Sequence, residues 1–123
     1  MTLTDTVKRA VDVAFTAAGD LVKDVTWRRQ TFGEYDPVTG TRETSQSDTT
    51  VRAVQDEITA SEYKSMGLSQ KAVHVLIPQI DFERAGAVDP AFDDKLIFNR
   101  TTYTAKSVKY EGAKAVWDIF ADV

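Results

Sequence analysis

The sequence of 123 residues contains no cysteine, one histidine, three prolines and six glycines. Without cysteine, disulfides and thiolate metal sites are excluded. The glycines are scattered and none precedes a lysine in the pattern of a phosphate-binding loop, so nucleotide chemistry is not expected. No apolar run approaches the roughly 20 residues that would span a membrane, and the N-terminus lacks the apolar core of a signal peptide. We therefore expect no cofactor and no membrane association.

Positive charge is also scarce. The chain has 15 lysines and arginines against 19 acidic residues, a formal net charge of −4 and a pI of about 4.9. Tight nonspecific binding to DNA usually requires a basic surface, because the release of phosphate counterions drives it. The basic pairs Lys8–Arg9 and Arg28–Arg29 are too short to alter this balance. The remaining composition is that of an ordinary globular chain, and its length fits a single domain over residues 1–123.

Helical spacing of apolar residues predicts an amphipathic helix over residues 4–18, within an N-terminal helical segment 1–20. Thr4 or Asp5 can cap its start, and Gly19 can end it in a left-handed conformation. We expect the apolar stripe to pack against a β core, with a neighbouring subunit as the alternative. The stripe consists of Val7, Val11, Ala14, Phe15 and Ala18.

The rest of the chain has the short-period pattern and turn signals of β structure. Strands are predicted over residues 22–32, 51–58, 72–77, 95–98, 102–110 and 114–121. Turns are predicted at Asn99-Arg100 and Glu111-Gly112, Pro78 should end the third strand, and a helical turn should stop at Gly67. Residues 79–94 are expected to be a connector. Six short strands with these signals predict a mainly β fold, a small barrel or sandwich with one N-terminal α-helix.

Residues 33–50 form a polar, threonine-rich stretch with turn chemistry at Asp36-Pro37 and Thr39-Gly40. Threonine tolerates extended backbone, so we expect a flexible hairpin arm, with a mobile loop as the alternative. Five residues in or beside this stretch are candidate interface residues because their positions are expected to be exposed, although plain solvated surface is an equal alternative. They are Arg28, Arg29, Tyr35, Asp36 and Arg42.

The chemistry of the side chains does not predict an enzyme. His74 could act as a base with Ser69 and a nearby acid, but nothing in the sequence places a nucleophile or an orienting acid beside it. A strand histidine at the barrel surface or at an interface is favoured. The acids of the connector do not have EF-hand spacing, so a solvated connector is favoured over a metal site. These acids are Asp81, Glu83, Asp89, Asp93 and Asp94.

Four aromatic residues on predicted strands could stack on bases, as in strand-based single-strand binders. Core packing is the favoured interpretation, because the basic groove of such binders is missing. The residues are Trp27, Phe98, Trp117 and Phe120.

Three segments carry a family resemblance. AFTAAGDLVKDVTWRR runs from a helix into a strand with a basic pair, and GEYDPVTG precedes a threonine-rich arm and the strand VRAVQDEI. In DKLIFNRTTYTAKSVKYEGAKAVWDIF, a hairpin with Tyr103 entering its second strand precedes a final strand, while KAVHVLIP is an apolar strand ending near a proline. Together these segments resemble the head-closure, or head-to-tail joining, proteins of long-tailed bacteriophages. The Asn99-Arg100 turn lacks the glycine often found there, and residues 79–94 are longer than expected.

The resemblance implies a structural virion protein of the phage neck and not an enzyme. Such a subunit forms a homo-oligomeric ring between the portal or adaptor protein of the head and the tail terminator or tail-tube protein. Packaged DNA would pass through the lumen without specific binding, and the ring would help to retain it. Assembly would take place in the host cytoplasm. A tail-completion or tail-terminator subunit is one alternative, and a small β-barrel nucleic-acid-binding module is an alternative of a different class.

Overall fold

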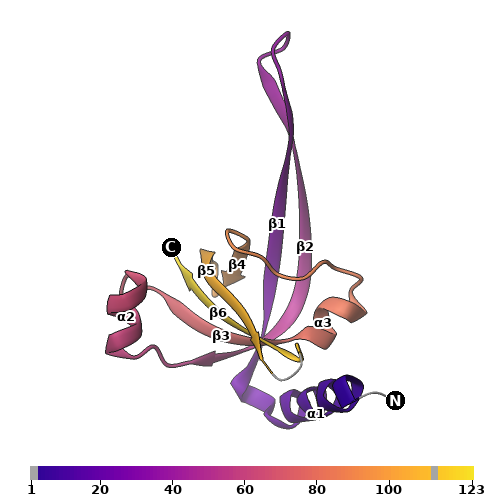
Figure 1. Ribbon diagram of the computed structural model, residues 1–123, viewed down its shortest axis with the longest axis vertical. Coiled ribbons are helices and arrows are strands. Elements are labelled where there is room, and N and C mark those ends of the chain that lie inside the picture. The colour runs from indigo at the N-terminus through magenta and orange to yellow at the C-terminus, as the bar shows by residue number, and fades with distance from the viewer. Residues whose placement is uncertain (1–2, 112–113) are drawn as a thin grey trace.

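A computed structural model describes residues 3–111 and 114–123 of the chain. Within these residues six antiparallel strands close into a barrel in the order β1-β2-β3-β6-β5-β4, with β4 returning to β1 (Figure 1). The mainly β prediction is therefore confirmed, and the fold is a barrel. The elements are α1 (Leu3–Ala17), η1 (Gly19–Leu21), β1 (Val22–Asp36), β2 (Thr41–Asp56), α2 (Ala60–Met66), β3 (Val73–Pro78), α3 (Gln79–Arg84), β4 (Lys95–Phe98), β5 (Thr101–Glu111) and β6 (Val116–Asp122).

Alternation along the strands directs every second side chain into the barrel, as the pleat of a β-strand requires. Val25 and Trp27 of β1 point inward, and so do Val73 and Val75 of β3. A small barrel is filled by such side chains and encloses no channel. The buried cluster is completed by Val51, Ala53, Ile77, Phe82, Leu96, Ala105, Trp117, Ile119 and Ala121.

The connector between β3 and β4 contains a helix that the sequence did not predict. α3 is only six residues long, too short for helical periodicity to show. It places Phe82 in the core, where the ring meets Trp27 edge-on at a centroid distance of 6.1 Å. Gln79 of the same helix is buried and accepts a hydrogen bond from the Trp117 indole. Burial of these two side chains therefore stabilises a helix that local propensity alone would not.

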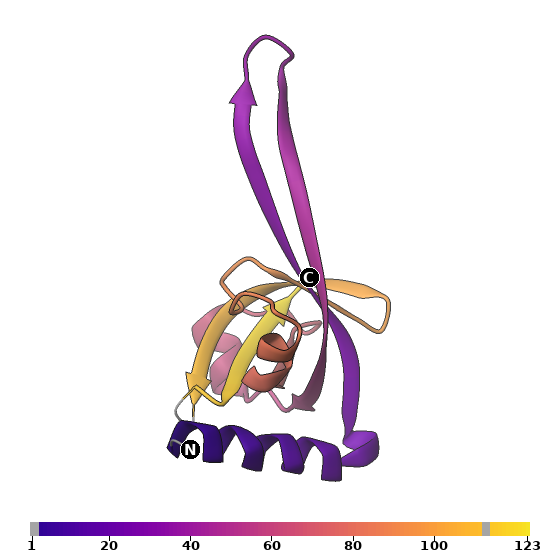
Figure 2. The same cartoon turned by 90° about the vertical axis from the view of Figure 1, so that its right-hand side faces the viewer.

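The N-terminal helix is confirmed, and Gly19 ends it with a φ of +58°. Its apolar stripe lies against the outside of the barrel and is only partly buried. Val7, Val11 and Phe15 are half-buried, but Ala14 is exposed and no α1 side chain that the structure describes is fully buried. α1 lies across the outside of the barrel, at the end opposite the long hairpin (Figure 2). The stripe therefore covers the barrel without joining its core.

Local turn chemistry is largely as predicted. Asn99 and Arg100 both have positive φ and form a two-residue hairpin loop. Gly67 ends α2 in a left-handed conformation, and Pro78 forms the last β3–β6 register pair. The predicted turn at Glu111-Gly112 includes Gly112, which lies outside the described residues. In the part of the chain that the structure describes, no helix combines the length and apolarity needed to cross a membrane.

Candidate interaction site

The most distinctive feature of the molecule is a β-hairpin arm, defined here as residues 29–48, that projects from the barrel (Figures 1 and 2). β1 pairs with β4 only over Thr26–Arg28, and β2 pairs with β3 only over Val54–Asp56. Beyond these points the two strands pair only with each other. At about 3.3 Å per residue, the eight β1 residues of the arm extend about 26 Å.

The arm is a hairpin and not an irregular loop, which resolves the two alternatives left by the sequence. At its tip the Asp36 carboxylate accepts a hydrogen bond from the Val38 N–H at 2.9 Å, and the Gly40 N–H donates to the Asp36 carbonyl at 2.8 Å. Gly40 has a φ of +70°, a conformation that glycine adopts without strain. The predicted turn chemistry is therefore confirmed.

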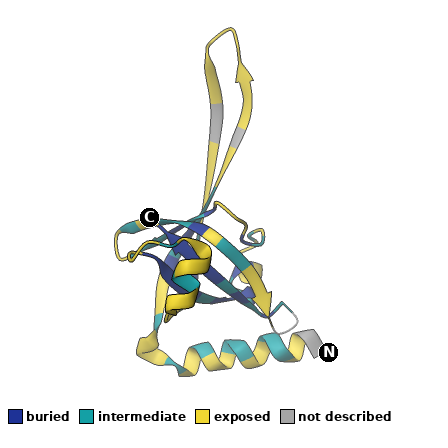
Figure 3. Ribbon diagram, turned by 60° about the vertical axis from the view of Figure 1, so that its left-hand side comes forward, coloured by how far each residue is buried: buried dark blue, intermediate teal, exposed yellow. Residues whose placement is uncertain are grey.

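The arm is solvated over its whole length. Every arm side chain from Gln30 outward that the structure describes is exposed (Figure 3). Both outer edges carry backbone N–H and C=O groups with no neighbouring strand, which is the usual template for pairing with another chain. Near the tip, two large hydrophobic side chains are exposed to solvent: Tyr35 is 58% exposed and Val38 is 92% exposed. Tyrosine is among the residues that most often anchor a protein interface, so Tyr35 is the stronger candidate of the two.

The base of the arm, in contrast, is rigidly held. The buried Asp94 carboxylate accepts hydrogen bonds from the Trp27 indole at 3.0 Å, the Arg29 guanidinium at 2.9 Å and the Ala91 N–H at 2.9 Å. Arg29 also donates to the Asp89 carbonyl at 2.7 Å. This cluster holds the connector before β4 against β1, so the base of the arm is fixed in place.

The candidate interface residues fall into two groups. Tyr35, Asp36 and Arg42 are exposed on the outer part of the arm, as expected. Arg28 and Arg29 are half-buried, so the assumption that they are exposed was wrong. Arg29 donates to Asp94 and Asp89 at the base of the arm, and Arg28 forms two hydrogen bonds with the Asp48 carboxylate.

The Arg28–Asp48 pair crosses the two strands where the arm leaves the barrel, with distances of 2.9 and 3.1 Å. Hydrogen bonding to Arg28 holds the pKa of the Asp48 carboxyl below its ordinary value. Both groups remain in contact with water, so the pair contributes little to stability. Arg28 and Asp48 are directly opposite each other in the β1–β2 register, so the pair links the two strands where the arm begins.

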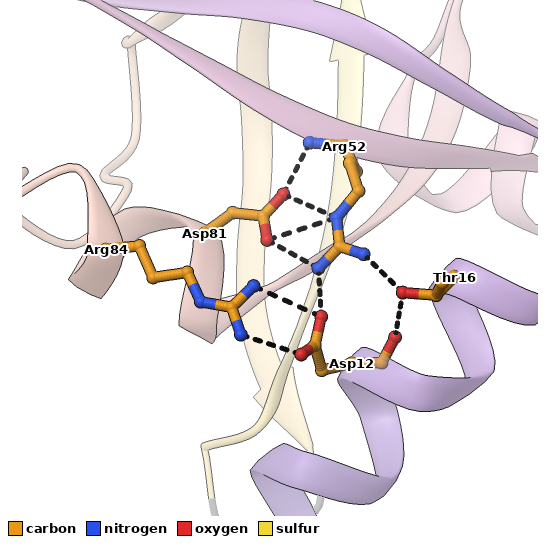
Figure 4. A network of polar contacts seen from close by, with 5 residues as sticks. All are labelled: Asp12, Thr16, Arg52, Asp81 and Arg84. Carbon is orange, nitrogen blue, oxygen red and sulfur yellow. Dashed lines mark hydrogen bonds and ion pairs between the residues drawn. The ribbon is translucent and has the colours of Figure 1, made fainter.

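At the opposite end, a charge network fastens α1 to the barrel (Figure 4). Nη2 of Arg52, on β2, lies 2.8 Å from Asp81 of α3 and 2.7 Å from Asp12 of α1. Arg84 of α3 holds the second Asp12 oxygen at 2.7 Å, and Thr16 accepts a hydrogen bond from Arg52 at 3.3 Å. The two acids and two arginines alternate in sign. Hydrogen bonds from Arg84 and Arg52 lower the pKa of Asp12.

The ion pairs among Arg52, Asp12 and Arg84 were not predicted from the sequence. Asp12 and Arg52 are 40 positions apart, and no local pattern links an acid on a helix with an outward-facing strand residue. Arg52 lies between two apolar strand residues, Val51 and Ala53. This alternation predicts that the Arg52 side chain faces outward, but it does not predict which residue it contacts.

The structure places His74 between an aromatic ring and two oxygen acceptors, and not beside Ser69. The ring lies on the outer face of β3 but is only 7% exposed, because it stacks on Phe120 with centroids 4.0 Å apart. Nε2 contacts the Asp118 carboxylate, and Nδ1 lies 3.2 Å from the Glu57 carbonyl oxygen. The hydroxyl of Ser69, the suggested nucleophile, donates to Asp122 and not to His74.

The acids of the connector are used mainly in ion pairs and hydrogen bonds. Asp81 pairs with Arg52, Glu83 with Lys8, and Asp89 with Lys114. Asp94 belongs to the cluster at the base of the arm. Among the described residues, no group of three or more histidines and acids is placed to hold a metal ion.

The aromatic residues considered for base stacking are mainly structural. Trp27 and Trp117 are buried inside the barrel, where their indole nitrogens donate to Asp94 and Gln79. Phe98 packs half-buried against the same core. The core interpretation is confirmed for these residues.

Comparison with known proteins gives a likeness of fold. No family model matches the sequence, and no curated protein matches it. Among solved structures, protein SF1141 from Shigella flexneri 2a, determined in solution, aligns with a TM-score of 0.55 at 15% sequence identity. The alignment covers 82% of this chain and 91% of that chain. At this identity the likeness shows the fold alone.

Proposed function

We propose that this chain is a structural subunit of a bacteriophage neck. It forms a ring that joins the portal or adaptor of the head to the tail and helps to retain packaged DNA. The family resemblance in the sequence suggests this role, and the observation that supports it most is the arm. A filled barrel with a long, polar, projecting ribbon is suited to binding a neighbouring subunit by shape and backbone pairing.

The ends of the molecule supply the two different surfaces that a ring subunit needs. A closed ring of identical subunits requires heterologous contacts, in which one patch meets a different patch on the next copy. The arm and the α1 surface lie at opposite ends of the barrel (Figure 2). A solvated two-stranded ribbon is marginally stable by itself, so the arm is expected to become ordered when it docks.

The test compares the full chain with a variant whose arm is shortened. Thr31 and Ser45 are directly paired, so residues 32–44 can be replaced by an Asn-Gly turn without changing the barrel register. Both proteins are mixed with the head and tail proteins encoded beside the gene, and joined particles are counted by electron microscopy. The full chain should form rings and joined particles. The shortened chain should keep the near-ultraviolet circular dichroism of the barrel but lose joining by at least tenfold.

Hydrogen exchange on the same samples provides a second readout. Amides of residues 33–50 should exchange rapidly in the free subunit and slowly in the ring. Equal joining by the shortened chain would remove the arm from the docking surface. A full chain that stays monomeric with every such partner, and is absent from purified particles, would refute the neck role itself.

A further inference from the structure

The connection between β2 and β3, residues 57–72, is a strap that passes outside the barrel. It contains α2, which has no buried residue and stands away from the arm (Figure 1). An open groove of about 500 Å³ lies beneath it, lined in part by Ile58, Tyr63 and His74. Because so little of the strap is buried, its position on the barrel depends on the polar contacts at its two ends.

Those contacts attach the strap to the outer faces of β3 and β6. Near its end, the Ser69 N–H donates to the Asp122 carboxylate at 2.7 Å, and the Ser69 hydroxyl donates to the other oxygen of that carboxylate. At its start, the Glu57 carbonyl oxygen lies 3.2 Å from Nδ1 of His74. Of the side-chain types in these two attachments, histidine is the one whose charge ordinarily changes near neutral pH.

Both ring nitrogens of His74 face acceptors. Nε2 meets the Asp118 carboxylate, and Nδ1 meets a backbone carbonyl, which can only accept a hydrogen bond. A neutral imidazole carries one N–H, so it can donate to only one of these two oxygens. An imidazolium ring carries two and can donate to both. The geometry is therefore complete only when the ring is protonated.

Acidic side chains face His74 from three elements packed around it. Asp118 faces it from β6, and Asp56 at the end of β2 has an oxygen 3.9 Å from Nδ1. Glu62 of α2 is also close enough to interact electrostatically with His74, and Tyr63 lines the same groove. Within the described residues that line the groove there is no lysine or arginine.

We propose that His74 is a proton-operated clasp for the strap. With both nitrogens protonated, it holds the Glu57 carbonyl and the Asp118 carboxylate together. When the ring loses a proton, one hydrogen bond is lost, the start of the strap is released and the groove beneath α2 widens. The clasp therefore closes at low pH and opens as the pH rises through the titration of His74. It operates at a different place from the arm and does not require the neck role.

Because His74 is the only histidine in the sequence, its titration can be followed on the intact chain through its imidazole NMR signals without ambiguity. Hydrogen exchange is measured above and below that titration, with rates corrected for the intrinsic effect of pH. Amides of residues 57–68 should exchange about fivefold faster above it, the factor expected for one hydrogen bond of ordinary net strength. Amides of β5 and β6 should keep their protection across the same range.

Two variants make the test specific. His74→Gln cannot change charge, so its strap should exchange at the same corrected rate on both sides of the range. Asp118→Asn keeps the histidine but offers an amide that can either donate or accept, so the pH effect should shrink to less than twofold. An unchanged strap in the natural sequence across the titration, or a fivefold effect that persists in His74→Gln, would overturn the clasp. If His74→Gln does not fold, Asp118→Asn decides by the same criterion.

Discussion

Arg100 occupies a backbone conformation that residues with a Cβ seldom adopt. Its φ is +64°, and its neighbour Asn99 has a φ of +50°, so the β4–β5 loop places two consecutive residues in the left-handed region. Asparagine tolerates this region, but for an arginine it costs roughly 1–2 kcal/mol. Glycine is the usual second residue of such a turn. The departure from the resembled family noted in the sequence is therefore a local strain in the structure.

Replacing Arg100 with glycine should stabilise the barrel. The substitution removes the left-handed strain but adds conformational freedom to the unfolded chain, so the net gain should be about 0.5–1 kcal/mol in the free energy of unfolding. Urea denaturation measures it. Arg100→Ala is the matched control, because it removes the same charged side chain and keeps the strain. An equal gain in the alanine variant would show that the side chain, and not the backbone, was responsible.

The helix α1 is attached to the barrel in a different way from the strands. Most inward side chains of the strands are buried, whereas the described side chains of the α1 stripe are at most half-buried. The remaining attachment is ionic: the Asp12 network, the Lys8–Glu83 pair and the Arg52 guanidinium over the Phe15 ring at 5.8 Å. Ion pairs near a surface weaken in salt, whereas apolar burial does not. α1 should therefore respond to salt and acid before the barrel does.

Asp12→Asn should loosen α1 and leave the barrel intact. The pKa of Asp12 is lowered in the folded chain, so its contribution to stability is present above the ordinary aspartate pKa. That contribution is lost as the pH falls through the lowered value. In the natural sequence, acid or 0.5 M salt should accelerate exchange of α1 amides, with rates corrected for the intrinsic effect of pH, by about fivefold, the factor for losing about 1 kcal/mol of ion-pair stabilisation. In Asp12→Asn these amides should already be fast at neutral pH.

A matched control is Asp20→Asn, an exposed acid in η1. It changes the net charge by the same amount, so α1 should stay as protected as in the natural sequence. Similar loosening in both variants would point to net charge and not to the Asp12 network.

At the scale of the whole molecule, function is expected to come from shape and surface. The large inward side chains are used to fill the barrel, and the arm and α1 extend from opposite ends (Figures 2 and 3). The two tryptophans considered for base stacking are inside the barrel. The formal net charge of −4 repels phosphate. In the proposed neck ring, such a subunit would surround the DNA without binding it specifically.

The chain should accordingly not bind single-stranded DNA tightly. At 50 mM salt, where phosphate contacts are strongest, filter binding should detect no complex below about 100 μM protein. Micromolar binding that weakens steeply as salt is raised would instead favour the nucleic-acid-binding module. A single-strand-binding protein of known affinity serves as the positive control for the assay.

Features that arise from short-range pattern can be predicted from the amino-acid sequence. Alternating apolar residues specified the strands, because one face of each must leave water. Gly19, Gly40 and Gly67 marked turns or helix ends that require positive φ, and Thr59 with Glu62 capped α2 through neighbouring contacts. These are interactions over a few residues, so the chain carries their signal locally.

Contacts between residues far apart in the sequence become known from the folded chain. α3 is a helix because Phe82 and Gln79 are buried by strands far along the chain. The links between Asp12 and Arg52, 40 positions apart, and between His74 and Asp118, 44 positions apart, leave no local trace. The arm is free because β3 and β4 pair only near its base. Partner choice across a closed barrel depends on register and closure, which are properties of the whole sheet and not of any segment.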